Sequence, residues 1–406
     1  MSEPLTRRVF CGTSLALAAA RGHTAEPPHD TTFVEDFDEL WHTLGERYCF
    51  FGEKRTDWAR VRALYRPIAV RAETLSVFTD VVRSVLAELY DAHTHLSDPP
   101  VGAPRWPLYD LLAERVGDTV RLAAIDDDSA ASDAGLVIGD QVVSVGGQPV
   151  EKVVHDLLPR CLSAPDAAAD AYAVNVAVAG RRGQERRFGI RSKGRDVREI
   201  VLGAKAAPAR PDVDSHRLDG GFGYVAIRSF AETSTVEAFD RALDAFRDAP
   251  GLVIDVRRNG GGDTAVARPI MGRFIHERRA YATMRRRQGA GLSVPWTEEV
   301  EPRGPFTFDK PVVVLTNHWS ASMAEGFPMG MRDIGRARIV GTRMMGLGAA
   351  VFPIRLDRTG LQAQYSGEPV YDTQGRPRWL LRPDIEVMDG SDILAAGLED
   401  LRRTRA

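Results

Sequence analysis

The clearest hydrophobic pattern in the chain is a short apolar run followed by small residues. Residues 312–315 are Val-Val-Val-Leu, which predicts a buried strand. Thr316-Asn317-His318 is typical of a turn, and residues 320–325 are rich in small residues and helix formers. A serine between a strand and a helix has an exposed hydroxyl beside unpaired N–H groups, as serine nucleophiles require. The same Ser-Ala-Ser pattern also fits a plain helix N-cap.

A second apolar pattern lies upstream and alternates strands with helices. Residues 224–227 and 251–257 read as strands, residues 235–246 read as a helix, and another helix is expected from about Thr264. This alternation predicts an α/β domain with buried strands. The second strand leads into Asn259-Gly260-Gly261-Gly262, where glycines let backbone N–H groups approach a ligand closely. No Gly-Lys-Ser/Thr follows, so the pattern does not match a phosphate loop; the alternative to a ligand-binding turn is a bare turn. Residues 276–310 show no regular pattern and are expected to be irregular.

The first hundred residues follow helical spacing instead. Residues 31–96 predict three helices, because their apolar side chains recur every three or four positions. The third helix ends before His93, which places this histidine in a loop where its side chain can face a cleft. His95 lies two residues further on, but two histidines without a third ligand nearby do not make a metal site.

After a proline-rich linker the hydrophobic period changes from helical to alternating. Residues 120–125 predict a strand, and residues 174–178 and 188–190 are expected to close a small sheet. A Pro/Ala-rich segment, residues 204–211, separates this part from the α/β domain.

Composition and charge limit the class of protein but do not identify it. The 406 residues suit two or three domains, and 44% hydrophobic with 27% charged content is ordinary for a globular protein. A net charge of -3 gives no support for a nucleic-acid partner. The three cysteines are scattered, so they form neither a disulfide framework nor a metal-binding spacing. No later segment is long and apolar enough to span a bilayer.

The N-terminus predicts export. Arg7, Arg8 and Phe10 precede an apolar run that ends in small residues, as in a signal peptide. The arginine pair resembles a twin-arginine signal. We therefore expect residues 1–25 to be a signal peptide and the protein to be periplasmic or extracellular.

Several motifs together resemble the C-terminal processing peptidases, also called tail-specific proteases, and particularly their tricorn-like branch. The stretch around Gly135-Leu136 and Gly139-Asp140 resembles a PDZ domain. The other motifs that carry the resemblance are Trp41 and Tyr48, Asp91-Ala92-His93-Thr94, Asp255-Val256-Arg257-Arg258-Asn259-Gly260-Gly261-Gly262, Ser320-Ala321-Ser322-Met323-Ala324-Glu325, and Pro383-Asp384-Ile385.

The resemblance implies a multidomain α/β architecture. It places an N-terminal helical subdomain at residues 26–100, a PDZ-like β-rich domain at 101–200 and a crotonase-like β/α peptidase core at 208–400. A PDZ domain binds the end of an extended chain at a sheet edge; otherwise this part is a structural spacer. The implied partners are protein or peptide substrates, whose C-terminal ends meet the PDZ-like domain, and no metal or organic cofactor is implied.

The resemblance also assigns a site. The nucleophile is Ser322, the base is His93, and the nearest residue for an orienting acid is Glu368. The N–H of Met323 supplies half of an oxyanion hole, and the other half comes from Gly261 or, failing it, Gly262.

The chain departs from the family pattern at three places. Many processing peptidases use a lysine about 25 residues after the serine, where this chain has Leu347. The tricorn-like branch has a serine before the histidine and a glutamate shortly before the Pro-Asp pair. This chain has Ala92 at the first place and, roughly, residues 377–379 at the second. Taken as a whole, the resemblance still implies a serine endopeptidase of the C-terminal processing type that works through an acyl-enzyme. The alternatives are a catalytically inactive binding protein on the same fold, and an esterase or amidase that uses the same serine.

Overall fold

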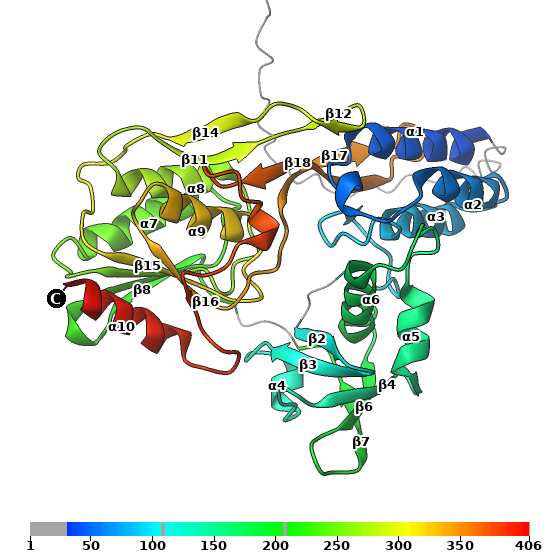
Figure 1. Ribbon diagram of the computed structural model, residues 1–406, viewed down its shortest axis with the longest axis horizontal. Helices are drawn as coiled ribbons and strands as arrows, with labels where there is room; N and C mark the ends of the chain where they lie inside the picture. The colour runs from blue at the N-terminus through cyan, green and yellow to red at the C-terminus, as the bar shows by residue number, and fades with distance from the viewer. Residues whose placement is uncertain (1–30, 107–109, 206–208, 406) are drawn as a thin grey trace, which may run out of the picture.

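The computed structural model describes residues 31–106, 110–205 and 209–405. Three parts are visible in Figure 1: N-terminal helices, a β-rich unit below them, and a larger α/β core beside both. The expected signal peptide, residues 1–25, lies outside the described residues.

The core is built on a six-stranded sheet in the order β19-β16-β15-β10-β9-β8. All neighbours pair in parallel except β8 and β9, which are antiparallel. The predicted strands and the α/β class are therefore confirmed for this part. The bounds are β8 Val213–Arg217, β9 Gly223–Ile227, β10 Leu252–Asp255, β15 Val312–Thr316, β16 Arg338–Gly341 and β19 Ile385–Glu386.

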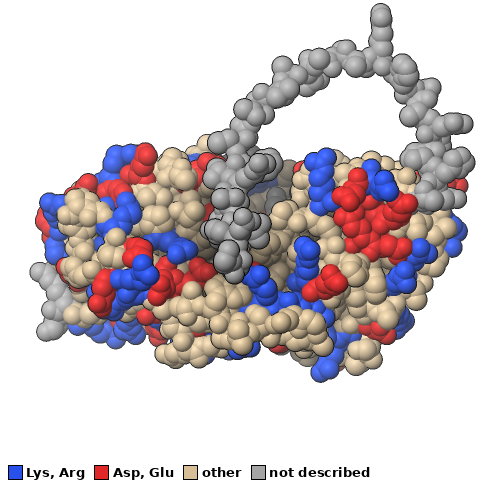
Figure 2. All heavy atoms as spheres, turned by 90° about the horizontal axis from the view of Figure 1, so that it is seen from above, with Lys and Arg blue, Asp and Glu red and all other residues tan. Residues whose placement is uncertain are grey.

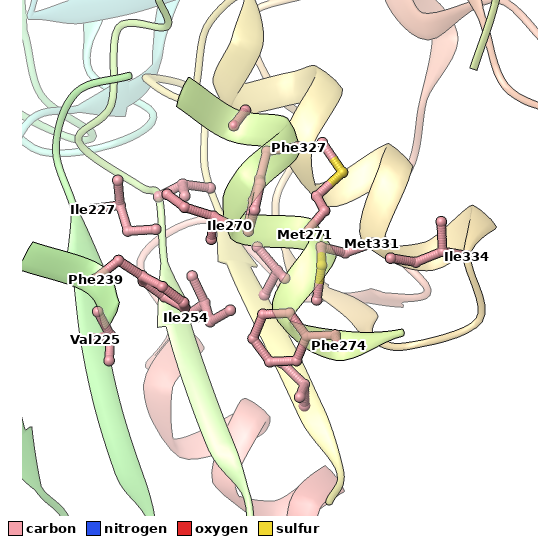
Figure 3. Packing of buried hydrophobic residues seen from close by; sticks show 14 of the residues in the cluster. Val225, Ile227, Phe239, Ile254, Ile270, Met271, Phe274, Phe327, Met331 and Ile334 are labelled. Carbon is pink, nitrogen blue, oxygen red and sulfur yellow. The ribbon is translucent and has the colours of Figure 1, made fainter. Parts of the chain in front are cut away.

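Both faces of this sheet are covered by helices (Figure 1). Along β15, Val312 and Val314 belong to the larger apolar cluster, whereas Val313 and Leu315 pack in a cluster with α10. Figure 3 shows the larger cluster, in which Phe327 of α9 lies close to Ile270 of α8. Both faces of the strands are apolar because both are buried. The helices are α7 Ser234–Ala245, α8 Thr264–Met271, α9 Met323–Asp333 and α10 Ile393–Arg405.

The N-terminal helices pack against a hairpin from the far end of the chain. The helices are α1 Thr31–Arg47, α2 Trp58–Val70 and α3 Leu75–Ala87; the hairpin is β17 Ala349–Arg355 with β18 Gln362–Tyr371. Asp36 of α1 accepts hydrogen bonds from the N–H groups of Arg358 and Thr359 in the hairpin turn. The short strand β1, His95–Leu96, pairs with β18. The loop before β1, which carries His93, is therefore fixed by residues about 270 positions later.

The expectation that residues 276–310 are irregular is wrong. The segment contains β11 Arg279–Met284 paired antiparallel with β14 Trp296–Val300, and the small hairpin of β12 Arg287–Gln288 and β13 Gly291–Leu292. β11 also pairs with β18. Only Tyr281, Ala282 and Val300 of the longer pair are fully buried, which is why the apolar alternation is too weak to see in the sequence.

The β-rich unit has the strand order β2-β3-β4-β6-β7, with β5 paired to β4. The expected strand at residues 174–178 is instead part of the helix α6, Ala167–Ala179. This helix is apolar on nearly all sides, so its short Val/Ala run has no helical periodicity. The other bounds are β2 Leu111–Val116, β3 Thr119–Ile125, α4 Ala130–Asp133, β4 Gln141–Val145, β5 Gln148–Pro149, α5 Val150–Leu157, β6 Arg186–Arg191 and β7 Val197–Leu202.

The surface carries both signs of charge. On the face shown in Figure 2, acidic and basic side chains are intermixed. Among the described residues, the structure contains no helix with the length and apolar character needed to cross a membrane.

Candidate active site

The turn between β15 and α9 holds Ser322 in a strained backbone conformation. Its φ is 55°, which is unfavourable for a residue with a side chain and is typical of functional turns. Ser322 is half-buried. Ser320 has a different role, because its hydroxyl donates to the Val256 carbonyl (2.9 Å) and accepts from Asn317 N–H (3.1 Å). The first serine of Ser-Ala-Ser thus shapes the turn. The second, Ser322, is the N-cap residue of α9 and forms a capping box with Glu325, as the N-cap alternative expected.

A buried carboxylate holds this turn against a second loop. Glu325, only 1% exposed, accepts hydrogen bonds from the N–H groups of Ser322 (3.0 Å), Gly346 (3.0 Å) and Leu347 (2.8 Å). Burial raises the pKa of Glu325, although the nearby guanidinium of Arg378 and these N–H groups oppose the rise. Leu347 stands where the family's lysine was sought, and Glu325 ties its backbone to the Ser322 turn.

The glycine-rich turn after β10 packs against Ser322. A Cβ on Gly261 would lie 2.8 Å from the Ser322 Cβ and 3.1 Å from the Met323 nitrogen, so only glycine fits there. Asn259 positions this turn: its backbone carbonyl accepts from Ala321 N–H (3.0 Å). The structure therefore brings the two glycine and serine motifs together, as an oxyanion hole needs.

The hydrogen bonds of this turn distinguish between the two glycine donors. The Gly261 N–H donates to the side chain of Asn259 (2.8 Å), so it is already occupied. Among the hydrogen bonds formed by the described residues, the N–H groups of Gly262 and Met323 have no acceptor. Free N–H groups beside a serine nucleophile are suited to stabilising a negative oxygen. Of the two glycines, Gly262 is therefore the one whose N–H remains free to donate within the described part of the chain.

His93 is buried at the end of the loop before β1, with 7% of its surface exposed. Its Nδ1 has no hydrogen-bond partner within the described part of the chain, and no hydrogen bond joins it to Ser322 there. Burial lowers the pKa of His93 to about 4; Asp91 opposes this shift, and Arg378 adds to it. The imidazole is therefore neutral near pH 7.

The His93 loop is held by Asp91. The Asp91 carboxylate accepts from the backbone N–H of His93 (3.0 Å) and from the hydroxyls of Thr94 (2.8 Å) and Ser366 (2.7 Å). Desolvation acts to raise the pKa of Asp91, but the positive charge of Lys54, the interaction with His93 and the hydrogen bond from the Ser366 hydroxyl outweigh it, so the pKa is lowered. Asp91 therefore fixes the loop backbone and does not bond to the imidazole ring.

Glu368 lies on β18 and is half-buried. It forms an ion pair with Arg286 (3.4 Å). The charged groups that shift the pKa of His93 are Asp91, Arg378 and His95. The orienting role expected for Glu368 stays a prediction.

Sequence reasoning gave no role to three residues that the structure places at the site: Glu325, Arg378 and Lys54. Arg378 is buried and donates to the carbonyls of Leu347 (2.6 Å) and Ala349 (3.2 Å). Lys54 donates to the Tyr90 carbonyl (3.2 Å), and burial lowers its pKa. Arg378 lies where the family's glutamate before the Pro-Asp pair was sought, and Glu325 stands in the helix turn that follows Ser322, whereas nothing in the spacing marks Lys54.

A cleft of about 1300 Å³ connects these elements. Its lining includes Asp91 and Lys54 from the N-terminal part, Leu347 from the core, and Ala113 and Asn175 from the β-rich unit. The three parts of the molecule therefore share one cleft beside the candidate site. The described residues contain no group of three or more His, Cys, Asp or Glu side chains that could hold a metal ion.

Comparison with known families gives two matches. Residues 221–387 match the model of peptidase family S41, and residues 29–87 match the model of the tricorn protease C1 domain. The first match contains the glycine-rich turn and Ser322, and the second contains the three N-terminal helices up to Ala87.

Known proteases are also similar in sequence and fold. A carboxy-terminal-processing protease of Bartonella bacilliformis is 24% identical over 248 residues, covering 59% of this chain and 52% of that protein. A carboxyl-terminal-processing protease of Synechocystis is 24% identical over 363 residues, covering 84% and 78%. The chain thus spans about half of the first relative. The crystal structure of mature CPAF superposes with a TM-score of 0.62 at 16% identity, covering 92% of this chain and 96% of that chain, which shows a shared fold.

Proposed function

We propose that the protein is a serine peptidase of the carboxyl-terminal-processing type, with Ser322 as its nucleophile. The observation that carries the proposal is the strained turn at Ser322 (φ 55°), packed against a glycine that no other residue can replace. The similarity to processing proteases supports peptide bonds of protein or peptide substrates as the target.

In the proposed reaction the Ser322 oxygen attacks the scissile carbonyl while His93 takes its proton. The N–H groups of Met323 and of Gly262, or of Gly261 once Asn259 releases it, stabilise the oxyanion. His93 then protonates the leaving amine, and water hydrolyses the acyl-enzyme by the same route. Because the pKa of His93 is lowered to about 4, the imidazole is unprotonated over the neutral range. We assign the role of orienting the imidazole to Glu368.

The β-rich unit, which resembles a PDZ domain, takes up extended C-terminal ends of the substrate in this proposal. Its cleft-facing strand β2 and helix α6 contribute to the same cleft as Leu347, which supports a delivery role. Export through residues 1–25 completes the proposal. Replacing Arg7 and Arg8 with lysine should keep the protein in the cytoplasm, and continued export would contradict a twin-arginine signal.

A catalytically inactive binding protein is the second candidate. It is favoured by the absence of a hydrogen bond between His93 and Ser322 among the described residues, and by Leu347 at the place of the family's lysine.

A fluorophosphonate probe separates the two functions. The parent should label and cleave a peptide substrate, and Ser322→Ala should lose labelling and about 10⁶-fold of the turnover. Ser320→Ala is the matched control: its hydroxyl only bonds within the turn, so labelling should persist. An unlabelled, inactive parent would favour the binding protein, and labelling without peptide cleavage would favour an esterase or amidase.

A further inference from the structure

The β-rich unit has a groove between its edge strand β2 and the helix α6. β2 pairs with β3 on one side only, and its other side faces α6. An extended polypeptide joins a sheet by bonding to the free backbone N–H and C=O groups of such an edge strand. The groove opens into the cleft that also reaches Leu347.

The backbone groups in the middle of this edge are already occupied. The Ala113 N–H donates to Oδ1 of Asn175 (3.0 Å), and Nδ2 of Asn175 donates to the Ala113 carbonyl (3.0 Å) and to the Ala171 carbonyl (2.9 Å). A side-chain amide has the same donor and acceptor as a peptide group. The Asn175 side chain therefore forms the hydrogen bonds to Ala113 that a residue of an added strand would form. Both Asn175 and Ala113 are buried.

A second contact closes the groove near the far end of β2. Arg115 donates to both carboxylate oxygens of Asp170 on α6 (2.8 and 2.9 Å). This pair is partly exposed and contributes little by itself. The buried amide contact is the stronger one, because leaving Ala113 unpaired in the interior is costly.

We propose that Asn175 is a gate on this groove. An extended polypeptide pairs with β2 only after the Asn175 amide leaves Ala113, so α6 must move before the β-rich unit takes up a chain. The inference takes the class of partner, an extended polypeptide, from the proposed function. Its test reads binding instead of cleavage, so its failure is distinguishable from failure of the proposed peptidase activity.

The test uses the full chain with Ser322→Ala, which prevents cleavage, and fluorescein-labelled β-casein as an unstructured polypeptide. Fluorescence anisotropy should show about tenfold tighter binding when Asn175→Ala is added, because the amide hydrogen bonds no longer compete. Asp170→Asn is the control: it removes the partly exposed ion pair and leaves Ala113 capped, so the affinity should change by less than about twofold. Equal affinity of the Asn175→Ala variant and its parent would overturn the gate.

Hydrogen exchange measured by mass spectrometry localises the effect. In the parent, the amides of residues 110–116 should be protected and unchanged by β-casein. In Asn175→Ala they should exchange faster and become protected again when β-casein is added. Asn175→Ser serves as a second variant if the alanine unfolds. If β-casein increases the protection of residues 110–116 in the parent, the groove is already open and the inference is wrong.

Discussion

The turn at Ser322 and the turn at Tyr90 differ in where their support comes from. These are the two non-glycine residues with positive φ in the described part of the chain, at 55° and 34°. Each precedes or carries a proposed catalytic group, and each is held by a carboxylate. Glu325, three residues after Ser322, supports the first turn, whereas Asp91 ties the second to Ser366, 275 residues away.

The two carboxylates also differ in charge environment. Glu325 is almost fully buried, and burial raises its pKa. Asp91 is half-buried, and Lys54 is the largest influence that brings its pKa below the usual value against desolvation. The comparison teaches that the Ser322 turn is held by backbone N–H groups that donate to one buried carboxylate, while the histidine loop depends on a charged lysine and a hydroxyl from distant parts of the chain. Four experiments test this difference.

Replacing His93 tests the histidine loop and is expected to have the largest effect of the four. His93→Gln should lower turnover by about 10²–10⁴-fold, because the serine loses its general base. His95→Gln is the matched control, since His95 stacks on Trp106 (ring centroids 3.8 Å apart) and bonds to the Leu96 carbonyl. Steady-state peptide hydrolysis gives the comparison. Nearly full activity in His93→Gln would place the base elsewhere.

The pH dependence of the parent's peptidase activity also tests whether His93 is the base. An unperturbed histidine titrates at about 6.5, but burial lowers the pKa of His93 to about 4. Activity should therefore rise through an acid-side step near that lower value and stay flat through neutrality. A step near pH 6.5 would show that the imidazole is solvated in the working enzyme.

Replacing Gly261 tests the nucleophile turn. Gly261→Ala should lower turnover by about 10²–10³-fold, because the new Cβ would press on Ser322 and on the Met323 nitrogen. Gly260→Ala is the control from the same turn, since a Cβ there meets nothing within 4 Å. A similar loss in both variants would mean that general stiffening of the turn, and not contact with Ser322, is responsible.

The smallest expected effect is on the free energy of unfolding. Its dependence on pH has opposite signs for Asp91 and Glu325. The lowered pKa of Asp91 means that its contribution is present above the unfolded value and is lost as pH falls through the folded value. Asp91→Asn should therefore cost about 2–4 kcal/mol of unfolding free energy near pH 7 and less in acid. The raised pKa of Glu325 acts oppositely: its contribution is present below the unfolded value and is lost as pH rises through the folded value.

Urea unfolding between pH 4 and 7 measures this contrast. Relative to the parent, Asp91→Asn should become less stable as pH rises, and Glu325→Gln should become relatively more stable. If the unfolding free energy of the two variants changed with pH in the same direction, the opposite pKa shifts of Glu325 and Asp91 would be contradicted.

The sequence determined the features that depend on neighbouring residues. The strand at residues 312–315, the turn and the helix around Ser322 follow from a short apolar run and small residues, and the glycine-rich turn follows from its composition. Backbone chemistry of this kind is local, so it is visible in the chain. Where burial removes periodicity, as in α6, or where few side chains are buried, as in β11 and β14, the same reasoning gave wrong elements.

The tertiary structure alone decided how the site is assembled. Only the fold shows that Gly261 presents its open side to Ser322 while its N–H is occupied by Asn259. Only the fold shows that burial lowers the pKa of His93, which the reference value for histidine had placed near 6.5. These properties arise from contacts between residues far apart in the chain and from exclusion of water, and neither is encoded in local spacing.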